Sequence, residues 1–355
     1  MNIGIDGNEA NTKTRVGSGQ YSFHILKELN KINKTHRFTV YLKNKPLGDM
    51  PKKNKLWQYK VIGPKLLWTK FALPLSLAIS KKNVDLFYSP THYSPNPSPI
   101  PTIPTIHDIG YLKTPNQFNK KDFYQLKNWT RDSIKKAKHI VAVSEFTKSE
   151  IIKEYKINPQ KISVIPDGIT KFKKHSSAKC KKILAKFKIT KPFFLSVGTL
   201  KPNKNYPFLI KAFAKLSGYQ LVISGKKGWL FDEIFKVVSD LKLQDKVIFT
   251  DFVTEIEKNI LFQTATATVL PSLYEGFGIP AIESQSFGTP VIVSDIPSYR
   301  EIMANSAVYV NPHDQNSLVK AMKNIKKSTS DNYKRYLWHN SAKKLLNLFN
   351  TLSNV

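Results

Sequence analysis

The sequence is poor in cysteine, acidic residues and long apolar runs, and each shortage excludes a class of protein. Cys180 is the single cysteine among 355 residues, so an internal disulfide framework is excluded and a reducing compartment is favoured. No cysteine and histidine spacing matches a zinc site. The most apolar segment, residues 66–79, is too short to span a bilayer and contains Lys70 and Pro74. The chain starts directly with a strand-like pattern, which predicts a protein without a signal peptide.

Acidic residues are scarce relative to basic ones. The chain has 56 Lys and Arg against 25 Asp and Glu, which gives a formal net charge of +31. Such an excess argues for a polyanionic environment and not for a particular fold. Three interpretations stay open: nucleic acid, an anionic membrane surface, or a lysine-rich composition without a specific partner. The lysines are spread along the chain, and neither an arginine-rich arm nor an aromatic RNA motif is present. A membrane surface is therefore the better specific hypothesis, and nucleic acid is disfavoured.

Apolar runs of strand length alternate with helical stretches in two successive series. A chain of this length is long for one domain, and two domains of about 150 residues each are expected. The first series starts with the run at residues 2–6 and the second with the run at 193–197, and a turn of small residues follows each. This alternation is typical of α/β proteins, so we expect two doubly wound parallel sheets. The polar, basic segment 171–190 is interpreted as the linker and the entry to the second domain.

Three local patterns give further expectations for helices. A helix is expected at residues 21–31, after a glycine-containing loop at 15–21. Residues 61–79 predict a strand and then an apolar helix that Pro74 interrupts. The last helix is expected at about residues 340–352.

The stretch that is most informative about function is residues 267–295. It has the pattern of a strand, a turn that contains Gly276 and Gly278, a helix that begins at Pro280, and a second strand. In open parallel sheets, ligands bind at the carboxyl ends of the strands, where this turn lies. The amide groups of residues 277–279 are placed at the N-terminus of the predicted helix, and the helix dipole there favours an anion.

Two carboxylates flank this turn. Glu275 lies in the turn and Glu283 about one helical turn into the helix, so both can reach one ligand. Carboxylates are poor ligands for phosphate but good acceptors for sugar hydroxyls, so a nucleotide-sugar would use both features. The eight-residue spacing, the proline at the helix start and the Ser-Asp-x-Pro sequence at 294–297 together resemble the Glu-x7-Glu signature of retaining glycosyltransferases of family 4.

The resemblance implies a fold and a set of roles. Family-4 enzymes have the GT-B fold, in which two Rossmann-like, doubly wound parallel-sheet domains face a central cleft. It implies an acceptor-side domain at residues 1–170, a nucleotide-sugar domain at 171–330, and a C-terminal helix at 331–355 that returns to the first domain. It also implies that Glu275 binds the donor sugar and Glu283 the ribose. The donor diphosphate would lie on the turn formed by Gly276, Phe277, Gly278 and Ile279.

The turn after the run at 193–197 matches the family as well. Residues 198–205 are Gly-Thr-Leu-Lys-Pro-Asn-Lys-Asn, close to the family's Gly-Thr-Leu-x-Pro-(Arg/Lys)-Lys-Asn. Lys204 matches the diphosphate-binding lysine, a compact charge suited to that task. Asn203 stands where the family usually has a basic residue. This difference either weakens stabilisation of the leaving group or transfers that role to Lys201. The resemblance also implies donor contacts from Thr199, Gly225, Lys226 and the backbone at Val253.

In the first domain the resemblance rests on three segments. Residues 102–118, TIPTIHDIGYLKTPNQF, resemble the family's Thr-x-His-Asp segment, in which the histidine lies beside the transferred sugar; His107 occupies that position. Residues 166–169 resemble the Pro-Asn-Gly segment that closes the domain, with Asp167 in place of asparagine. The loop at 15–21 lacks the three-glycine dinucleotide fingerprint. In the family the matching loop approaches the donor phosphate and the acceptor, which implies contacts from Gly17, Ser18 and Gly19.

The resemblance finally implies a reaction: retaining transfer of a sugar from a nucleoside-diphosphate-sugar to a hydroxyl of a glycan or lipid-linked acceptor. GDP-mannose is the favoured donor, and His107, Lys204 and Glu275 are the expected catalytic residues. The sequence has no Asp-x-Asp element, so we expect neither a catalytic metal nor a cofactor, and the nucleotide-sugar is a substrate. The enzyme is expected in the cytoplasm, with peripheral contact at the inner face of an anionic membrane.

Two other kinds of function stay open. One is a nucleotide-sugar epimerase or a phosphorylase on the same fold, which would act without a glycan acceptor or with inorganic phosphate. The other is a basic nucleic-acid-binding protein, motivated by the net charge of +31. A steep salt dependence of binding to unrelated DNA would favour it.

Overall fold

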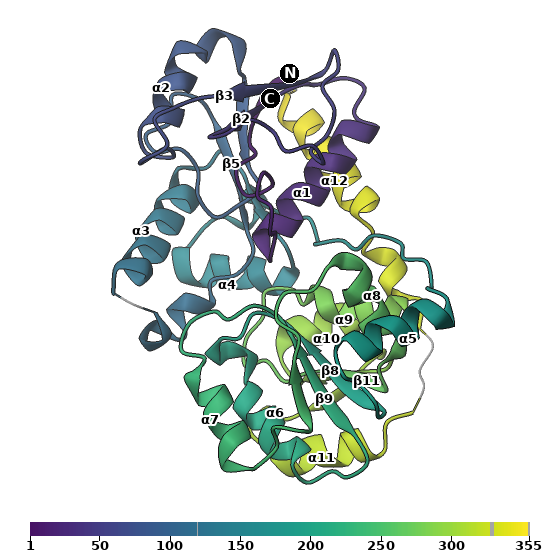
Figure 1. Cartoon of the computed structure of the whole chain (residues 1–355). Coiled ribbons are helices and arrows are strands. Elements are labelled where there is room, and N and C mark those ends of the chain that lie inside the picture. Colours follow the sequence, from purple (N-terminus) through teal and green to yellow (C-terminus); the bar gives the residue numbers. More distant parts are fainter. Residues whose placement is uncertain (119, 327–329, 354–355) are drawn as a thin grey trace. The chain divides into compact units, whose positions relative to one another are not determined.

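The computed structural model describes residues 1–118, 120–326 and 330–353. The chain divides into two compact units, each built on its own sheet (Figure 1). Unit 1 comprises Met1–Gly168 and Tyr336–Val355, and unit 2 comprises Ile169–Arg335. The predicted α/β class with two doubly wound parallel sheets is confirmed.

Unit 1 contains a seven-stranded sheet in the order β3-β2-β1-β4-β5-β6-β7, and every pairing is parallel. The chain runs outward from β1 to β3 on one side and from β4 to β7 on the other. The strand order therefore reverses between β1 and β4, which makes that crevice the expected ligand position of this sheet. The strands are β1 (Asn2–Asp6), β2 (Arg37–Leu42), β3 (Trp57–Val61), β4 (Leu86–Ser89), β5 (Thr102–Ile106), β6 (Ile140–Ala142) and β7 (Ile162–Val164).

Helices cover both faces of this sheet because neighbouring strand residues point to opposite faces. Val40 and Tyr88 pack in one buried cluster with α1 and α12, while Tyr41 and Phe87 pack with α2 in another. The second face also carries α3 and α4. α12, from the end of the chain, lies along α1, as Figure 1 shows. The helices are α1 (Ser18–Ile32), α2 (Ala72–Ile79), α3 (Lys120–Lys136), α4 (Glu145–Tyr155) and α12 (Trp338–Ser353).

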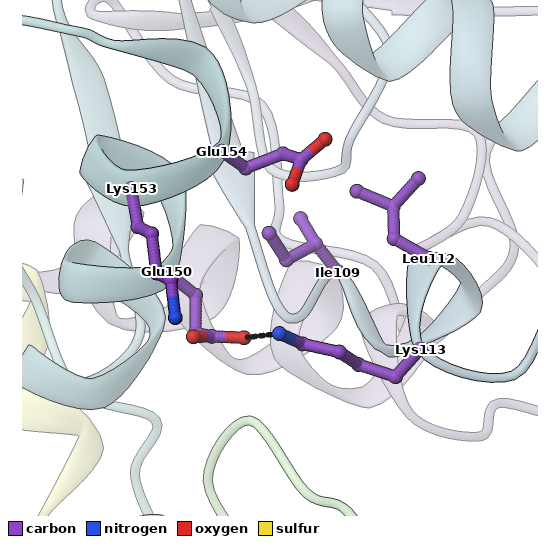
Figure 2. A pocket seen from close by; sticks show the side chains of 6 residues that line it. All are labelled: Ile109, Leu112, Lys113, Glu150, Lys153 and Glu154. Carbon is purple, nitrogen blue, oxygen red and sulfur yellow. Dashed lines mark ion pairs between the residues drawn. The ribbon is translucent and has the colours of Figure 1, made fainter.

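A small hollow lies in unit 1 where α4 faces the loop after β5 (Figure 2). Its volume is about 110 Å³, and Lys113 and Glu150 form an ion pair of 3.1 Å that joins its two walls. Sites for drug-sized ligands have volumes of about 300–1,000 Å³, so this hollow is too small for a nucleotide-sugar. Its lining consists of Ile109, Leu112, Lys113, Glu150, Lys153 and Glu154.

Unit 2 contains a six-stranded sheet in the order β10-β9-β8-β11-β12-β13, again with parallel pairings throughout. Here the strand order reverses between β8 and β11. The strands are β8 (Phe193–Val197), β9 (Gln220–Ser224), β10 (Val247–Phe249), β11 (Ala267–Leu270), β12 (Val291–Ser294) and β13 (Val308–Val310). The helices are α5 (Ser177–Lys186), α6 (Tyr206–Phe213), α7 (Asp232–Asp240), α8 (Glu255–Thr264), α9 (Ile279–Ser286), α10 (Pro297–Met303) and α11 (Gln315–Lys323).

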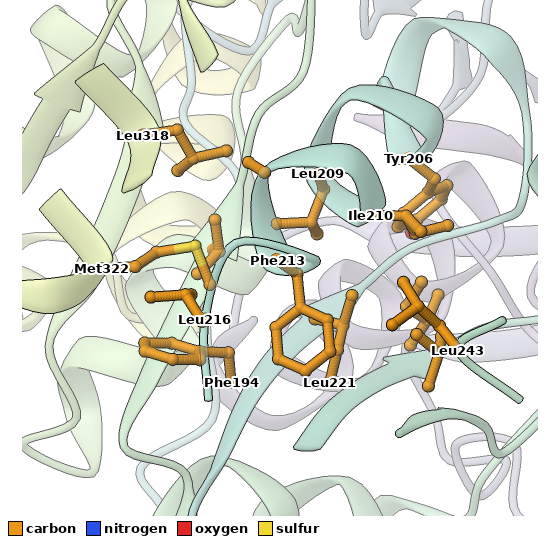
Figure 3. Packing of buried hydrophobic residues seen from close by; sticks show 14 of the residues in the cluster. Phe194, Tyr206, Leu209, Ile210, Phe213, Leu216, Leu221, Leu243, Leu318 and Met322 are labelled. Carbon is orange, nitrogen blue, oxygen red and sulfur yellow. The ribbon is translucent and has the colours of Figure 1, made fainter. Parts of the chain in front are cut away.

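The core of unit 2 packs against this sheet beneath the turns that follow its strands. Figure 3 shows Leu209 and Phe213 of α6 packed with Phe194 of β8 and Leu221 of β9, all four buried. Burial of each such side chain contributes about 1.5–3 kcal/mol to stability. α7 and α11 complete this face, and α5, α8 and α9 cover the other. The turns at the strand ends therefore rest on a packed base.

Four local predictions differ from the structure. α1 begins at Ser18 and not at Tyr21, so Ser18 and Gly19 lie in the first helical turn. Pro74 does not interrupt α2, because it occupies the third position of the helix, where the missing N–H would have no helical partner. The segment 171–190 contains α5, whose first turn is capped by the Ser176 side chain. The last helix begins at Trp338, two residues before the expected start.

Candidate functional site

The reversal point of the unit 2 sheet brings together two of the predicted turns. β8 leads into the turn with Lys204, and β11 leads into the turn with Glu275, and these strands are neighbours. Backbone contacts join the turns, because the Leu273 amide donates to the Asn203 carbonyl at 2.8 Å. Asn203 also donates through its side chain to the Tyr274 carbonyl at 3.2 Å. Asn203, which departs from the family pattern, thus fixes one turn against the other.

Lys204 and Glu275 form an ion pair at this point. Lys204 Nζ lies 2.5 Å from Glu275 Oε1, although the two residues are 71 positions apart. Both side chains are mostly shielded, with 17% and 14% of their surfaces exposed. An ion pair in such a partly buried place is screened less by salt than one on the surface. The reversal point therefore holds one cation and one carboxylate, which are paired with each other.

The glycine turn leads directly into α9. Gly278 is the N-cap residue of this eight-residue helix, and Pro280 stands in its first turn. Gly278 has a φ of 111°, and an added Cβ would lie 2.5 Å from Cε1 of the buried Tyr299 ring. The turn therefore requires glycine for both its backbone angle and its space. Gly276 and Phe277 are buried beside it.

We expect Gly278→Ala to lower the free energy of unfolding by roughly 2–4 kcal/mol. About 1–2 kcal/mol comes from the positive φ, and the rest from the collision with Tyr299. Gly288→Ala is the matched control: its φ is 76°, but nothing lies within 4 Å of the added Cβ, so only the first cost applies. Urea denaturation of both variants measures the difference. Equal losses in the two variants would contradict the close packing of Tyr299 against the turn.

Glu283 forms an ion pair with a lysine from the neighbouring helix α8. Lys258 Nζ of α8 lies 2.6 Å from Glu283 Oε1 and 3.2 Å from Glu255 Oε2. Burial opposes the charge on Lys258, but the attraction of Glu283 and Glu255 outweighs it and raises the pKa of the ammonium. Burial also raises the pKa of the Glu283 carboxyl, and Lys258 counteracts that rise. Because a charged ammonium lies within hydrogen-bond distance, we take the pair as ionised.

The ends of β9 and β10 bring the remaining predicted donor residues to the same edge of the sheet. The Leu200 amide donates to the Lys226 carbonyl at 3.0 Å, so a backbone hydrogen bond joins the turn after β9 to the turn after β8. A Cβ on Gly225 would lie 2.0 Å from the Gly198 carbonyl oxygen, which shows how closely the two backbones approach. Val253 is half-buried after β10. All the predicted residues of unit 2 therefore lie at the carboxyl ends of β8 to β11: Thr199, Lys204, Gly225, Lys226, Val253, Glu275, Gly276, Phe277, Gly278, Ile279 and Glu283.

The predicted residues of unit 1 lie at the carboxyl ends of its own strands. Gly17 is the N-cap residue of α1, and Ser18 and Gly19 form its first turn after the loop from β1. His107 directly follows β5, next to β4 in the sheet. The ring Nε2 of His107 lies 3.1 Å from the carbonyl oxygen of Pro90, which follows β4. Because a carbonyl only accepts, Nε2 carries the proton and Nδ1 is the lone-pair nitrogen.

A buried cluster surrounds His107. The Tyr21 ring meets it edge to face with 4.8 Å between centroids, and the His92 ring stacks on it at 5.6 Å. Asp167 Oδ1 lies 3.9 Å from His107 Nδ1, which is too long for a hydrogen bond. Burial, with His92 adding to it, lowers the pKa of His107 to about 4, and burial raises the pKa of Asp167 to about 8. At neutral pH the two groups therefore face each other uncharged.

Two polar atoms of this cluster lack partners within the part of the chain that the structure describes. They are Asp167 Oδ1 and His92 Nδ1, and both are buried atoms. Each buried polar atom without a hydrogen bond costs about 1–3 kcal/mol, so such atoms in a native protein point to a ligand or to bound water. The cluster thus presents unused hydrogen-bonding capacity beside His107.

Asp167→Asn is expected to stabilise the protein increasingly as the pH rises. The pKa of Asp167 is about 8 when folded, against 3.8 for a free side chain. Between these values the folded state keeps a proton that the unfolded state has released, so stability falls with pH by up to about 1.4 kcal/mol per unit. Asparagine resembles the protonated acid and does not titrate. We therefore expect a gain of at least about 2 kcal/mol at pH 8 and almost none at pH 4.

Urea denaturation at the two pH values measures this gain. Asp245→Asn is the control, because it removes a carboxylate from an exposed position. A gain for Asp167→Asn that is the same at pH 4 and pH 8 would show that Asp167 is not buried as a neutral acid.

Sequence reasoning found the motif residues but missed the residues that support them. Lys258 was missed because its partner Glu283 is 25 positions away and meets it only through the packing of α8 on α9. Asp167 was noticed only as a departure from the family's asparagine. His92 stood in a proline-rich loop without a pattern of its own. The structure brings the unit 2 residues together at one sheet edge and groups Asp167 and His92 around His107.

Across residues 1–118, 120–326 and 330–353, no group of three or more His, Cys, Asp or Glu side chains is arranged to hold a metal ion. In the same part of the chain, every helix is too short or too polar to cross a membrane.

Models of two protein families match the chain in succession. The family described as Glycosyltransferase Family 4 matches residues 17–171, and the family described as Glycosyl transferases group 1 matches residues 181–344. The first match lies in unit 1 except for its last residues. The second begins in α5 and continues into α12. Together they account for nearly the whole chain.

Two curated relatives have similar sequences. The O-antigen chain mannosyltransferase RfbU of Salmonella typhimurium is 38% identical over 222 residues, which cover 62% of this chain and 60% of the relative. The O-antigen chain mannosyltransferase B of Escherichia coli is 28% identical over 244 residues, 66% of this chain and 63% of the relative. The matched region therefore spans less than two thirds of either relative.

A solved structure shares the fold over the full chain. Sucrose-phosphate synthase from Thermosynechococcus elongatus superposes with a TM-score of 0.77 and covers 99% of both chains at 17% identity. At this identity the likeness concerns the fold alone.

Proposed function

Because the chain belongs to the family-4 glycosyltransferases of the GT-B fold, we propose that it transfers a sugar from a nucleoside-diphosphate-sugar to a hydroxyl acceptor. The observation that supports this most strongly is the pairing of Lys204 with Glu275 at the reversal point of the unit 2 sheet. Open parallel sheets bind ligands at that point. A cation, a helix N-terminus and two carboxylates together suit the three parts of such a donor: diphosphate, sugar and ribose.

Each residue then has a role. The diphosphate takes the place of Glu275 as the partner of Lys204, and the turn before α9 adds the positive end of a helix dipole. Glu275, released from Lys204, accepts hydrogen bonds from sugar hydroxyls. Glu283, held in place by Lys258, accepts from the ribose hydroxyls. Lys204 and the turn stabilise the negative charge that develops on the leaving diphosphate, the kind of preorganised electrostatics that dominates many enzymes.

The transfer we propose retains the anomeric configuration. The bond between the anomeric carbon and the phosphate oxygen breaks, and the acceptor oxygen bonds to that carbon on the same face. The acceptor hydroxyl proton passes to the departing phosphate. No protein nucleophile and no metal ion are required in this scheme.

His107 contributes to sugar recognition as a neutral acceptor. Its pKa of about 4 keeps the ring uncharged at neutral pH, and Nε2 is occupied by the Pro90 carbonyl. Nδ1 is then available to accept a hydrogen bond from a sugar hydroxyl. The unused oxygen of Asp167 lies beside it for a second hydroxyl.

The donor we favour is GDP-mannose, and the acceptor is a growing glycan or a lipid-linked one. This follows the names of the two mannosyltransferase relatives, both of which concern the O-antigen chain. UDP-sugars are the alternative donors. A nucleotide-sugar epimerase or phosphorylase on the same fold is the alternative function.

The test is a transfer assay with GDP-mannose, UDP-glucose and UDP-galactose, each with simple mannosides or a bacterial lipid extract as acceptor. We expect nucleoside diphosphate release that depends on the acceptor, is unchanged by EDTA, and gives a glycoside of the donor's anomeric configuration by NMR. An altered sugar nucleotide made without acceptor would instead identify an epimerase. Sugar phosphate formed only with inorganic phosphate would identify a phosphorylase.

A further inference from the structure

Exposed large apolar side chains are concentrated in one short segment of unit 1. Six of the thirteen large apolar side chains that are exposed in it fall within residues 61–79. Five of them, between 53% and 80% exposed, form what we call the α2 face: Leu66, Leu67, Phe71, Leu75 and Ile79. Single exposed apolar residues need no explanation, but a group of them within one short segment points to an interaction surface.

The helical geometry explains why these side chains stay uncovered. α2 is apolar on both sides: Ala72, Leu73 and Leu77 are buried against Tyr41 and Phe87 of the sheet. Phe71, Leu75 and Ile79 recur every four residues, so they lie on the opposite side of the helix. A helix that is apolar all round is ordinarily buried all round. Here the described part of the chain covers only one side, and Figure 1 shows α2 at the outer edge of unit 1.

The charge around the α2 face is of one sign. Residues 50–84 contain eight lysines and no aspartate or glutamate. Lys65, Lys81 and Lys82 are exposed at the two ends of the apolar group, and none of the three forms an ion pair with any described residue. The full set of lysines is Lys52, Lys53, Lys55, Lys60, Lys65, Lys70, Lys81 and Lys82.

We propose that the α2 face inserts into the interface of an anionic lipid bilayer, with its lysines at the level of the headgroups. Apolar side chains at the centre and lysines at the rim match the two layers of such an interface, hydrocarbon boundary and anionic headgroup. Lysine suits the rim because its apolar stem can lie along the lipid while the ammonium stays in water. The α2 face therefore accounts for part of the large positive charge of the chain.

A second copy of the chain is a poorer occupant of this surface. Each copy carries a net charge of +31, and the lysines that frame the α2 face would meet the same lysines of the other copy. Like charges brought together in this way oppose association. An anionic bilayer instead offers charge complementarity. The proposal does not depend on sugar transfer, because it concerns the surface alone.

The experiment is co-sedimentation of the full chain with vesicles of phosphatidylcholine, with and without phosphatidylglycerol. We expect binding to the vesicles that contain phosphatidylglycerol, weakened by salt because the attraction is screened. Replacement of Lys65, Lys81 and Lys82 by glutamine should weaken binding by about a hundred-fold, since each lysine near an anionic surface contributes roughly five-fold. The variant Leu66→Ser/Leu75→Ser/Ile79→Ser should weaken it by at least about ten-fold.

A matched control separates this surface from general charge. Replacement of Lys179, Lys181 and Lys182 of α5 by glutamine removes the same charge from an exposed helix of unit 2. It should leave vesicle binding within about three-fold of wild type. Equal losses for the two lysine variants would overturn the proposal, as would no vesicle binding at all. Self-association by light scattering that the serine variant abolishes, without vesicle binding, would assign the α2 face to a second copy instead.

Discussion

Lys204→Met is expected to lower the rate of sugar transfer by about 10²- to 10³-fold, the loss typical when one group that stabilises a developing anion is removed. Lys204 is the cation at the reversal point between β8 and β11, and methionine keeps most of its length without the charge. The affinity for the nucleoside diphosphate should fall as well, because the diphosphate loses its charged partner. Steady-state kinetics with the donor found in the transfer assay measures both effects.

The control for this prediction is Lys211→Met. Lys211 lies exposed on α6, in the helix that follows Lys204, and should tolerate the change with activity near wild type. Glu275→Gln is the complementary variant. It removes the carboxylate but leaves Lys204 charged, so transfer should fall while nucleotide binding persists or strengthens. Full activity of Lys204→Met would contradict the proposed function.

Lys258→Met is expected to destabilise unit 2 by about 3–5 kcal/mol, because it leaves the buried Glu283 carboxylate without its cation. The double variant Lys258→Met/Glu283→Leu replaces both charges with apolar groups and should recover most of the stability. Its nucleotide binding should not recover, since the carboxylate proposed for the ribose is gone. Urea denaturation with nucleotide titration of each variant separates the two effects.

An ion pair on the protein surface supplies the control for these single and double variants. Lys236 and Asp240 form an exposed ion pair on α7 with 2.8 Å between Nζ and Oδ2. Lys236→Met should leave the free energy of unfolding almost unchanged, as is usual for exposed pairs. If Lys258→Met were as mild as Lys236→Met, the Lys258–Glu283 pair would not be the buried element described above. If the double variant bound nucleotide as wild type does, Glu283 would have no part in donor recognition.

Local sequence patterns predicted most elements because local chemistry determines them. α8 covers Glu255–Thr264, and its start is fixed by the reciprocal hydrogen bonds of Thr254 and Glu257, a pattern that the local sequence carries. Ser144 caps α4 through its side chain, again a short-range contact. α5 was missed because its sequence, SAKCKKILAK, is so rich in lysine that its apolar periodicity is faint. Lys186 of that helix pairs with Glu257 of α8, a contact that the local sequence does not reveal.

The candidate site was predictable as a set of motifs but not as an arrangement. The family pattern identified Lys204 and Glu275 separately, while their ion pair depends on β8 and β11 being neighbours in the sheet. Strand order is a long-range property, and no spacing in the sequence encodes it directly. The same holds for Asp167, whose raised pKa results from its burial, beside a histidine that is distant in the sequence. Burial and pairing, unlike motifs, become visible only in the folded chain.

The most direct test of the central claim is the melting temperature of the wild-type protein with GDP, UDP or ADP, each with and without EDTA. A ligand that binds only the folded state stabilises it, by about 2.7 kcal/mol at a concentration of a hundred times Kd. We predict a rise with one nucleotide, GDP before UDP, that EDTA leaves unchanged and that is lost in Lys204→Met. No rise with any nucleotide, together with a rise with heparin or DNA, would contradict the assignment and favour a protein that binds nucleic acid.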